Sequence, residues 1–196
     1  MTVRDTNPYP WPWDGVLDPA RTALVVCGLQ RCWAELDPAI TAHLLALVPA
    51  ARAAGLQVVF VQHARLRATG RPGADLPLTG DAAAELLLAA TDDDVVVTAS
   101  THDGFLATPL DATMRARGID HLVFVGLAAE VVVDSTLRSA NDRGYECLTV
   151  VDATAPFDAH TGARTLDSIT KSGGIFGAIG TSAAVADAYR IAIDPQ

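Results

Sequence analysis

Five short runs of apolar residues, rich in valine and leucine, constrain the fold of this chain most strongly. They are continuous rather than alternating, as strands covered on both faces should be. Stretches with a helical pattern separate them, and strands that alternate with helices indicate parallel βαβ units. The sequence therefore predicts a three-layer α/β/α domain with a central, mostly parallel, Rossmann-like doubly wound sheet. The runs are Ala23–Cys27, Leu56–Val61, Val95–Val97, Leu122–Val125 and Leu148–Val151.

Glycines and capping residues mark the ends of the predicted helices. Thr108 is expected to cap one helix, with Pro109 in its first turn, and Gly118 to end that helix in a left-handed conformation. A longer helix is expected to stop at Gly144. The helices are predicted at about 40–54, 109–117, 129–143, 161–171 and 182–191.

Length and charge limit the class of protein. The 196 residues, half of them apolar, suit one domain over 1–196 with an N-terminal arm over 1–20. Fourteen basic and 23 acidic residues give a net charge of −9, and no basic run occurs. We therefore expect no nucleic-acid partner.

Targeting signals are not expected. The first 20 residues lack the apolar core of a signal peptide, and no run reaches the roughly 18 apolar residues of a membrane span. The three cysteines, Cys27, Cys32 and Cys147, are an odd number at no metal-ligand spacing. A reduced cytoplasmic location without membrane contact is the expectation.

Ligands of open parallel sheets bind beyond the carboxyl ends of the strands. The segments expected there hold no Gly-x-Gly-x-x-Gly motif and no phosphate-binding loop, so no cofactor is predicted. The long Gly- and Pro-containing loop Ala64–Gly80 is expected to be a lid or an oligomer contact. The segments at this edge are 27–30, 62–63, 99–105, 126–130 and 152–157.

Several of these segments resemble motifs of the isochorismatase-like cysteine hydrolases. The run Ala23–Gln30 is similar to the family's first strand, which usually ends in Asp-Met-Gln. Asp103–Asp111 resembles the segment after the third strand, and Gly126–Thr136 resembles the nucleophile turn and helix. The match is tightest from Ser139 to Ala184, and the opening Tyr9–Gly15 resembles the biuret-hydrolase-like branch in particular.

The resemblance implies a catalytic triad whose positions can be read in this chain. Family members hydrolyse amides with a cysteine, an activating aspartate and an assisting lysine. The aspartate position is Gly28, the lysine position is Ala99 and the cysteine position is Val132, while the single lysine of the chain is Lys171. Loss of such groups costs on the order of a million-fold in turnover, so Cys-dependent amidase chemistry is not expected.

Two interpretations of the replaced positions stay open. A wider, neutral and apolar floor would suit a small-molecule site, but a decaying site would look the same. His102 and Asp103 are the catalytic candidates for acid–base work, although His102 also fits a solvated loop histidine. His63 could join these two in a metal site, but the spacing is unspecific and no metal is predicted.

Other side chains at this edge also have a structural alternative. Glu130 suits a helix cap or an acid, and Asp134 one turn later is expected to face solvent or a neighbouring subunit. Cys27 fits the core, whereas Cys32 is more open. In the family, the peptide bond matching Leu127–Ala128 is cis and directs backbone N–H groups into the site. The predicted ligand-binding residues are Gly28, Gln30, Cys32, Trp33, His63, Ala99, Phe105, Leu127, Ala128 and Val132, with Trp11, Trp13 and Phe157 as further aromatic candidates.

Three functions follow as hypotheses. The first is a repurposed protein that binds, and converts without a covalent intermediate, a small carbonyl-bearing organic metabolite, as an isomerase, cyclase, lyase or atypical hydrolase. The second is a non-catalytic subunit that partners an active homologue. The third is a hydrolase with a substitute nucleophile such as Cys32. The resemblance also implies a homodimer or homotetramer.

Overall fold

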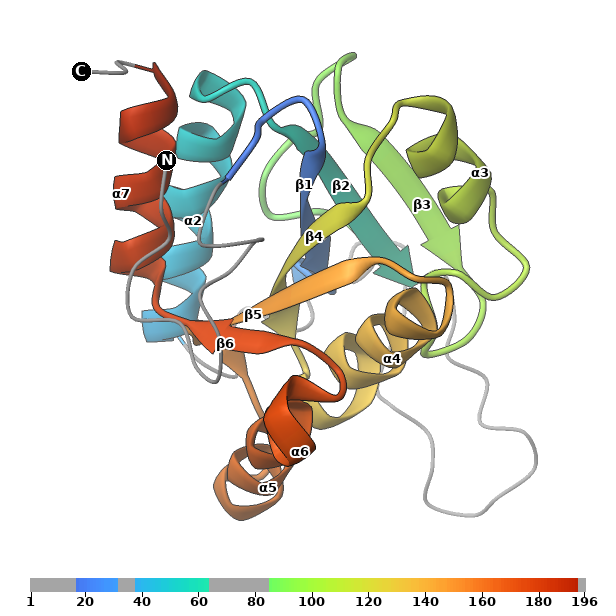
Figure 1. The fold of residues 1–196 in the computed structure, drawn as a ribbon, viewed down its shortest axis with the longest axis vertical. Coiled ribbons are helices and arrows are strands. Elements are labelled where there is room, and N and C mark those ends of the chain that lie inside the picture. The colour runs from blue at the N-terminus through green and yellow to red at the C-terminus, as the bar shows by residue number, and fades with distance from the viewer. Residues whose placement is uncertain (1–16, 32–37, 64–84, 194–196) are drawn as a thin grey trace.

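Six parallel strands form one twisted sheet at the centre of the computed structural model, which describes residues 17–31, 38–63 and 85–193 (Figure 1). The strand order is β3-β2-β1-β4-β5-β6, so the chain winds outward from β1 to β3 and then returns to the other side of β1. The predicted doubly wound sheet is confirmed. The strands are β1 (Thr22–Cys27), β2 (Gln57–His63), β3 (Val95–Ala99), β4 (His121–Leu127), β5 (Glu146–Ala155) and β6 (Ala178–Gly180).

Helices cover both faces of the sheet. On one face α2 (Pro38–Ala53) lies beside α7 (Ser182–Ile193), and on the other face α3 (Leu110–Ala116) and α4 (Asp134–Asp142) pack against the strands (Figure 1). The chain between β5 and β6 forms α5 (Ala159–Ile169) and the short α6 (Lys171–Gly174). Within the described part of the chain, none of the helices is both long and apolar enough to cross a membrane.

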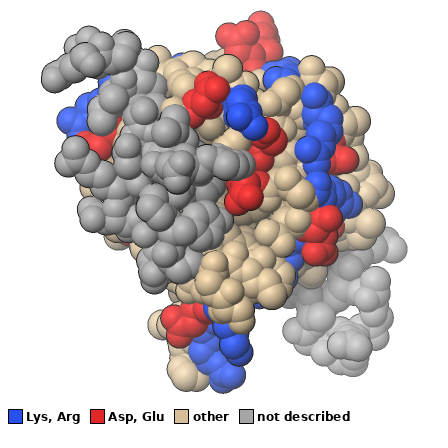
Figure 2. Space-filling model, viewed as in Figure 1, with Lys and Arg blue, Asp and Glu red and all other residues tan. Residues whose placement is uncertain are grey.

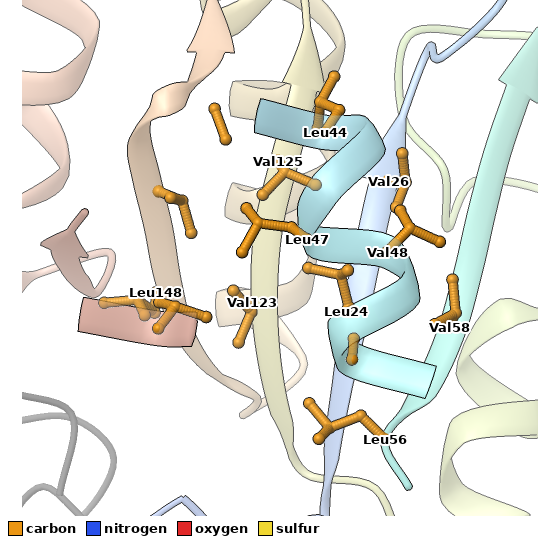
Figure 3. Packing of buried hydrophobic residues seen from close by; sticks show 14 of the residues in the cluster. Leu24, Val26, Leu44, Leu47, Val48, Leu56, Val58, Val123, Val125 and Leu148 are labelled. Carbon is orange, nitrogen blue, oxygen red and sulfur yellow. The ribbon is translucent and has the colours of Figure 1, made fainter. Parts of the chain in front are cut away.

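Two apolar clusters, one on each face, explain why the strand sequences are continuous rather than alternating. Leu24 and Val26 of β1 join the cluster under α2 and α7, whereas Val25 and Cys27 join the cluster under α3 and α4. Figure 3 shows the first cluster, where side chains of α2 lie over those of β1, β2 and β4. Since both faces are buried, the side chains on either side of these strands meet apolar neighbours.

The structure differs from the predicted elements in three places. β6 was not predicted, because it is only three residues long and two of them are alanine and glycine. The predicted helix over 129–143 begins as a π-helix, η2 (Ala129–Val133), before continuing as α4. Pro109 rather than Thr108 occupies the N-cap position of α3, although the Thr108 hydroxyl still accepts a hydrogen bond from the Leu110 amide at 3.3 Å. The predicted loop Ala64–Gly80 and most of the predicted N-terminal arm lie outside the described residues.

Charged side chains of both signs share the surface. On the face in Figure 2, basic and acidic groups stand beside one another with uncharged surface between them. Several charged side chains of the described residues form ion pairs, such as the half-buried pair of Arg138 with Asp134 at 2.8 Å and the exposed pair of Arg31 with Glu85 at 3.0 Å. Exposed pairs of this kind contribute little to stability, so the apolar clusters carry the fold.

Gly126 occupies the tightest backbone contact between β1 and β4. Its φ is +125°, and a Cβ built there would lie 1.9 Å from the carbonyl oxygen of Cys27. Because that atom belongs to the backbone of a central strand, it cannot move aside as a flexible side chain would. The position therefore requires glycine for both conformation and space.

We expect Gly126→Ala to lower the free energy of unfolding by about 3 kcal/mol or more, or to prevent folding, because the new methyl group would push β1 from β4. Gly118→Ala is the matched control, since Gly118 also has a positive φ, of +71°, but nothing lies within 4 Å of the position that a Cβ would take there. That variant should lose only about 1 kcal/mol. Urea unfolding measures both, and equal losses would contradict the contact argument.

Candidate functional site

The carboxyl ends of the central strands bring the predicted site residues to one edge of the sheet. In the strand register, Cys27 of β1 lies opposite Val61 of β2 and Gly126 of β4, and His63 lies opposite Ala99 of β3. The chain reverses its winding direction between β1 and β4, which is where ligands bind in open α/β sheets. This edge is the candidate site.

The three positions singled out by the family resemblance are neutral and inaccessible to solvent. Ala99 is 0% exposed and Val132 is 1% exposed, and both join the apolar cluster under α3 and α4. Gly28 is buried with a φ of +64°, and its amide donates to the Val61 carbonyl at 2.9 Å. We call these three buried, uncharged positions the floor of the candidate site. Lys171 is exposed at the start of α6 and takes no part in it.

The turn after β4 has an unusual backbone. The Leu127–Ala128 peptide bond is cis, as the resemblance implied. The amides of Val131, Val132 and Val133 all approach the Ala128 carbonyl at 3.1–3.2 Å, which gives the π-helix η2. These three amides are therefore used within the turn, and π-helical turns occur frequently at functional sites.

Among the predicted site residues in the described part of the chain, His63 is the most deeply buried titratable side chain. The neighbouring Cys27 is buried to the same extent. His63 is 0% exposed, and neither ring nitrogen has a hydrogen-bond partner within the described structure. Burial, with a smaller contribution from the nearby His102, lowers the pKa of His63 to about 4. The backbone of Thr101 opposes this shift but does not reach hydrogen-bond geometry with either nitrogen. The ring is consequently neutral at physiological pH.

Gln30 holds the backbone of His63 in place. Its amide nitrogen donates to the His63 carbonyl at 3.1 Å, and its side-chain oxygen accepts from the His63 amide at 2.8 Å. Gln30 is itself fully buried, and its backbone pairs with Leu86. The predicted ligand-binding residue Gln30 is thus engaged by the main chain of β2.

The two predicted catalytic residues are placed differently from each other. The side chain of His102 is exposed, as expected for a solvated loop histidine. Asp103 accepts hydrogen bonds from the Phe105 amide and the Ser139 hydroxyl, each at 2.8 Å, so both carboxylate oxygens are used. Asp103 therefore ties the loop after β3 to α4, and a catalytic role for the pair stays a prediction.

Glu130 and Asp134 both have protein partners. One oxygen of Glu130, Oε1, accepts from the amides of Phe157 at 2.8 Å and Asp158 at 3.1 Å, so Glu130 caps the loop before α5 rather than its own helix. The other oxygen, Oε2, is buried and has no partner within the described structure. Asp134 accepts two hydrogen bonds from Arg138 instead of facing solvent alone.

The described cysteines are unsuited to act as nucleophiles. Cys27 is fully buried, and burial raises its pKa to about 12. Cys147 is also buried, which raises its pKa as well. A thiol in an apolar setting stays protonated and unreactive. The predicted residues Cys32 and Trp33, together with Trp11 and Trp13, lie outside the described residues.

Aromatic and hydroxyl groups complete the edge. Phe105 is buried under the guanidinium of Arg143, which lies 5.1 Å from its ring centre, whereas Phe157 is exposed. The Thr136 hydroxyl accepts from the Gly104 amide at 3.0 Å and helps hold the loop after β3. The sequence carried no signal for this role of Thr136, because its partner lies 32 residues away.

No metal cluster marks this edge in the part of the chain that is described. His63, His102 and Asp103 do not gather as a metal site, and no other group of three or more His, Cys, Asp or Glu does so among the described residues. A cavity of about 620 Å³ lies at the opposite edge of the sheet, where Arg52 pairs with Asp94. Because ligands of parallel sheets bind at the carboxyl ends, that cavity is not the candidate site.

Two buried histidines should make the protein less stable in mild acid. Burial lowers the pKa of His63 and His121 to about 4, against 6.5 for an ordinary histidine. Below pH 6.5 the unfolded chain therefore binds more protons than the folded chain. The free energy of unfolding has its full value above pH 6.5 and falls as the pH drops toward 4, and we call this decrease the acid loss. We expect His63→Leu to remove about 3 kcal/mol of this acid loss.

Urea unfolding from about pH 7.5 down to about pH 4 measures the effect. His121→Leu is the matched control, because His121 is buried at the start of β4, on the opposite edge of the sheet. The His121→Leu variant should remove the contribution of His121 to the acid loss and keep the contribution of His63. A His63→Leu protein that keeps the full wild-type pH dependence would contradict a neutral buried ring.

Comparison with known proteins agrees with this geometry. Residues 22–181 match the isochorismatase domain. Ureidoacrylate amidohydrolase RutB from Methylobacterium radiotolerans is 34% identical, with 70% of this chain and 68% of that protein covered.

Solved structures of the same fold are also similar to this chain. A cysteine hydrolase from Pseudomonas syringae has a TM-score of 0.79 at 27% identity, covering 90% of this chain and 95% of that chain. An isochorismatase family protein from Burkholderia thailandensis has a TM-score of 0.77 at 29% identity, covering 89% of this chain and 98% of that chain. Since the matching domain spans most of its length, this chain belongs to the isochorismatase family.

Proposed function

We propose that this chain uses the isochorismatase fold to bind a small carbonyl-bearing organic molecule without a covalent thiolate step. The observation that carries this proposal is the neutral floor of the candidate site, made by Gly28, Ala99 and Val132. By the family resemblance these are the positions of the aspartate, the lysine and the cysteine. The only lysine of the chain, Lys171, stands exposed on α6 rather than at the position that the resemblance assigns to the family's lysine.

The ligand class follows from the relatives and from the chemistry of the floor. RutB from Methylobacterium radiotolerans is named for an amide hydrolysis of ureidoacrylate, so ureido compounds are the first class to test. An apolar floor with few polar groups favours an uncharged part of a ligand. Conversion of the ligand would use shape, backbone donors and acid–base work by His102 and Asp103, as in an isomerisation, cyclisation, elimination or atypical hydrolysis.

The relatives also support a second candidate, a hydrolase with a substitute nucleophile. RutB and the Pseudomonas syringae protein are both named as hydrolases. Burial and a raised pKa argue against Cys27 and Cys147, which leaves Cys32 for that role. The same neutral floor fits a non-catalytic subunit that joins an active homologue, and co-purification of such a homologue would distinguish that case.

We expect purified protein to be stabilised by members of a panel of small amides, ureas, lactams, enones and hydroxy acids, because a ligand that binds only the folded state raises Tm by mass action. Differential scanning fluorimetry at ligand concentrations well above Kd measures the shift. Gly126→Ala cannot serve as a control, because we expect that variant to be destabilised or unfolded. Heat-denatured protein and buffer without protein, each measured with every ligand, correct for effects of the ligands on the dye. A panel without any shift would overturn the proposed binding function.

We expect iodoacetamide to leave this ligand-induced shift unchanged and to inhibit no hydrolysis of ureidoacrylate, because no cysteine is predicted to act. Mass spectrometry of the labelled protein checks that Cys32 has reacted while the buried Cys27 and Cys147 have not. Cys32→Ser supplies the matched variant. Hydrolysis that is lost both on alkylation and in Cys32→Ser would establish the substitute-nucleophile function instead.

A further inference from the structure

The imidazole of His63 is a buried polar group for which the described residues supply no hydrogen-bond partner. Both ring nitrogens are shielded from solvent and lack a hydrogen-bond partner within the described structure. Burying an unpaired polar group costs free energy, so each such group in a native protein calls for an explanation. The backbone of His63 does not share this lack, because Gln30 binds both its amide and its carbonyl.

The ring lies on the face of the sheet that holds the neutral floor. Val59 and Val61 of β2 join the apolar cluster that contains Ala99 and Val132. Side chains two residues apart in a strand share a face, so His63 extends this row by one step at the carboxyl end of β2. Its register partner across the sheet is Ala99. The unused nitrogens therefore stand beside the floor, at the edge where ligands bind.

The charge state of the ring limits what it can recognise. The lowered pKa of His63 leaves a neutral ring with one N–H donor and one acceptor nitrogen. A carboxylate placed against it would receive no positive charge from the ring itself, and a buried charge without a paired group is costly. An amide or a ureido group carries no charge, and its carbonyl oxygen and N–H groups suit either ring nitrogen.

We propose that His63 is a specificity-determining residue whose neutral imidazole hydrogen-bonds to an amide or ureido group of the ligand and discriminates against a carboxylate at that position. This inference rests on the proposed function, because it names the part of the carbonyl-bearing ligand that the site reads. It assigns to His63 a contact with ligand and no proton transfer.

The test uses two ligands of matched length and four proteins. 3-Ureidopropionate carries a ureido group where glutarate carries a methylene and a carboxylate. Binding of each is measured by isothermal titration calorimetry and by the shift in Tm, with wild type, His63→Leu, His63→Gln and His121→Leu. His121→Leu removes the other deeply buried histidine of the described structure, at the opposite edge of the sheet.

Wild type should bind 3-ureidopropionate at least about tenfold more tightly than glutarate, and His63→Leu should lose about tenfold or more of that affinity. His63→Gln keeps a donor and an acceptor, so it should retain part of the preference. His121→Leu should bind like wild type. Without ligand at neutral pH, His63→Leu should be at least as stable as wild type, because leucine fills the site without unpaired nitrogens.

A purely structural role for the ring gives different results. His63→Leu would then bind 3-ureidopropionate within about twofold of wild type, or would lose stability together with binding, and either result overturns the inference. If wild type binds other carbonyl compounds but not 3-ureidopropionate, the inference fails while the proposed function stands. If wild type binds no member of the panel, both fail together.

Discussion

The close approach of β1 and β4 at Gly126 is the contact on which the site depends. Only glycine can sit there, because a Cβ would meet the Cys27 carbonyl oxygen at 1.9 Å. With the two strands this close, Gly28 follows directly after β1 and η2 begins three residues after Gly126. The spacing of the central strands thus sets where Gly28 and Val132 stand relative to each other. Glycine at position 126 therefore permits the close pairing of β1 and β4 at the switch point of the sheet.

Burial of both faces then decides how polar groups at this edge behave. Most of them are used to hold loops in place: Gln30 binds the backbone of His63, Asp103 binds Ser139, and Glu130 binds the amides before α5. The amide and carboxylate groups of these three residues, which are of types suited to catalysis, therefore stabilise the loops at this edge. The ring of His63 stands out because the same edge supplies it with no partner among the described residues.

The sequence predicted the sheet well, because continuous apolar runs follow directly from burial on both faces. It missed β6, because a strand of three residues, two of them alanine and glycine, gives no such run. It also missed the π-helix, because the sequence does not show which carbonyl accepts the hydrogen bonds of the η2 amides. Side-chain roles were harder to predict. Whether Asp103 is free to act depends on Ser139, 36 residues away, and only the packing of α4 against the loop after β3 reveals that contact.

The chemistry of charge in a buried site explains why three neutral residues belong together in the proposed function. A cysteine thiolate, an aspartate and a lysine stabilise one another, and a buried charge that loses its partner is strongly unfavourable. Once one member of such a set is gone, an apolar residue in place of each of the others removes an unpaired charge. In the proposed function, Gly28, Ala99 and Val132 are such replacements, since each is small or apolar and each is buried. A floor without charge also keeps the ring of His63 neutral, because among the described residues no carboxylate offsets the effect of burial on its pKa. In the proposed function, the lack of charge on these three residues that disfavours a thiolate step also favours recognition of an uncharged amide or ureido group.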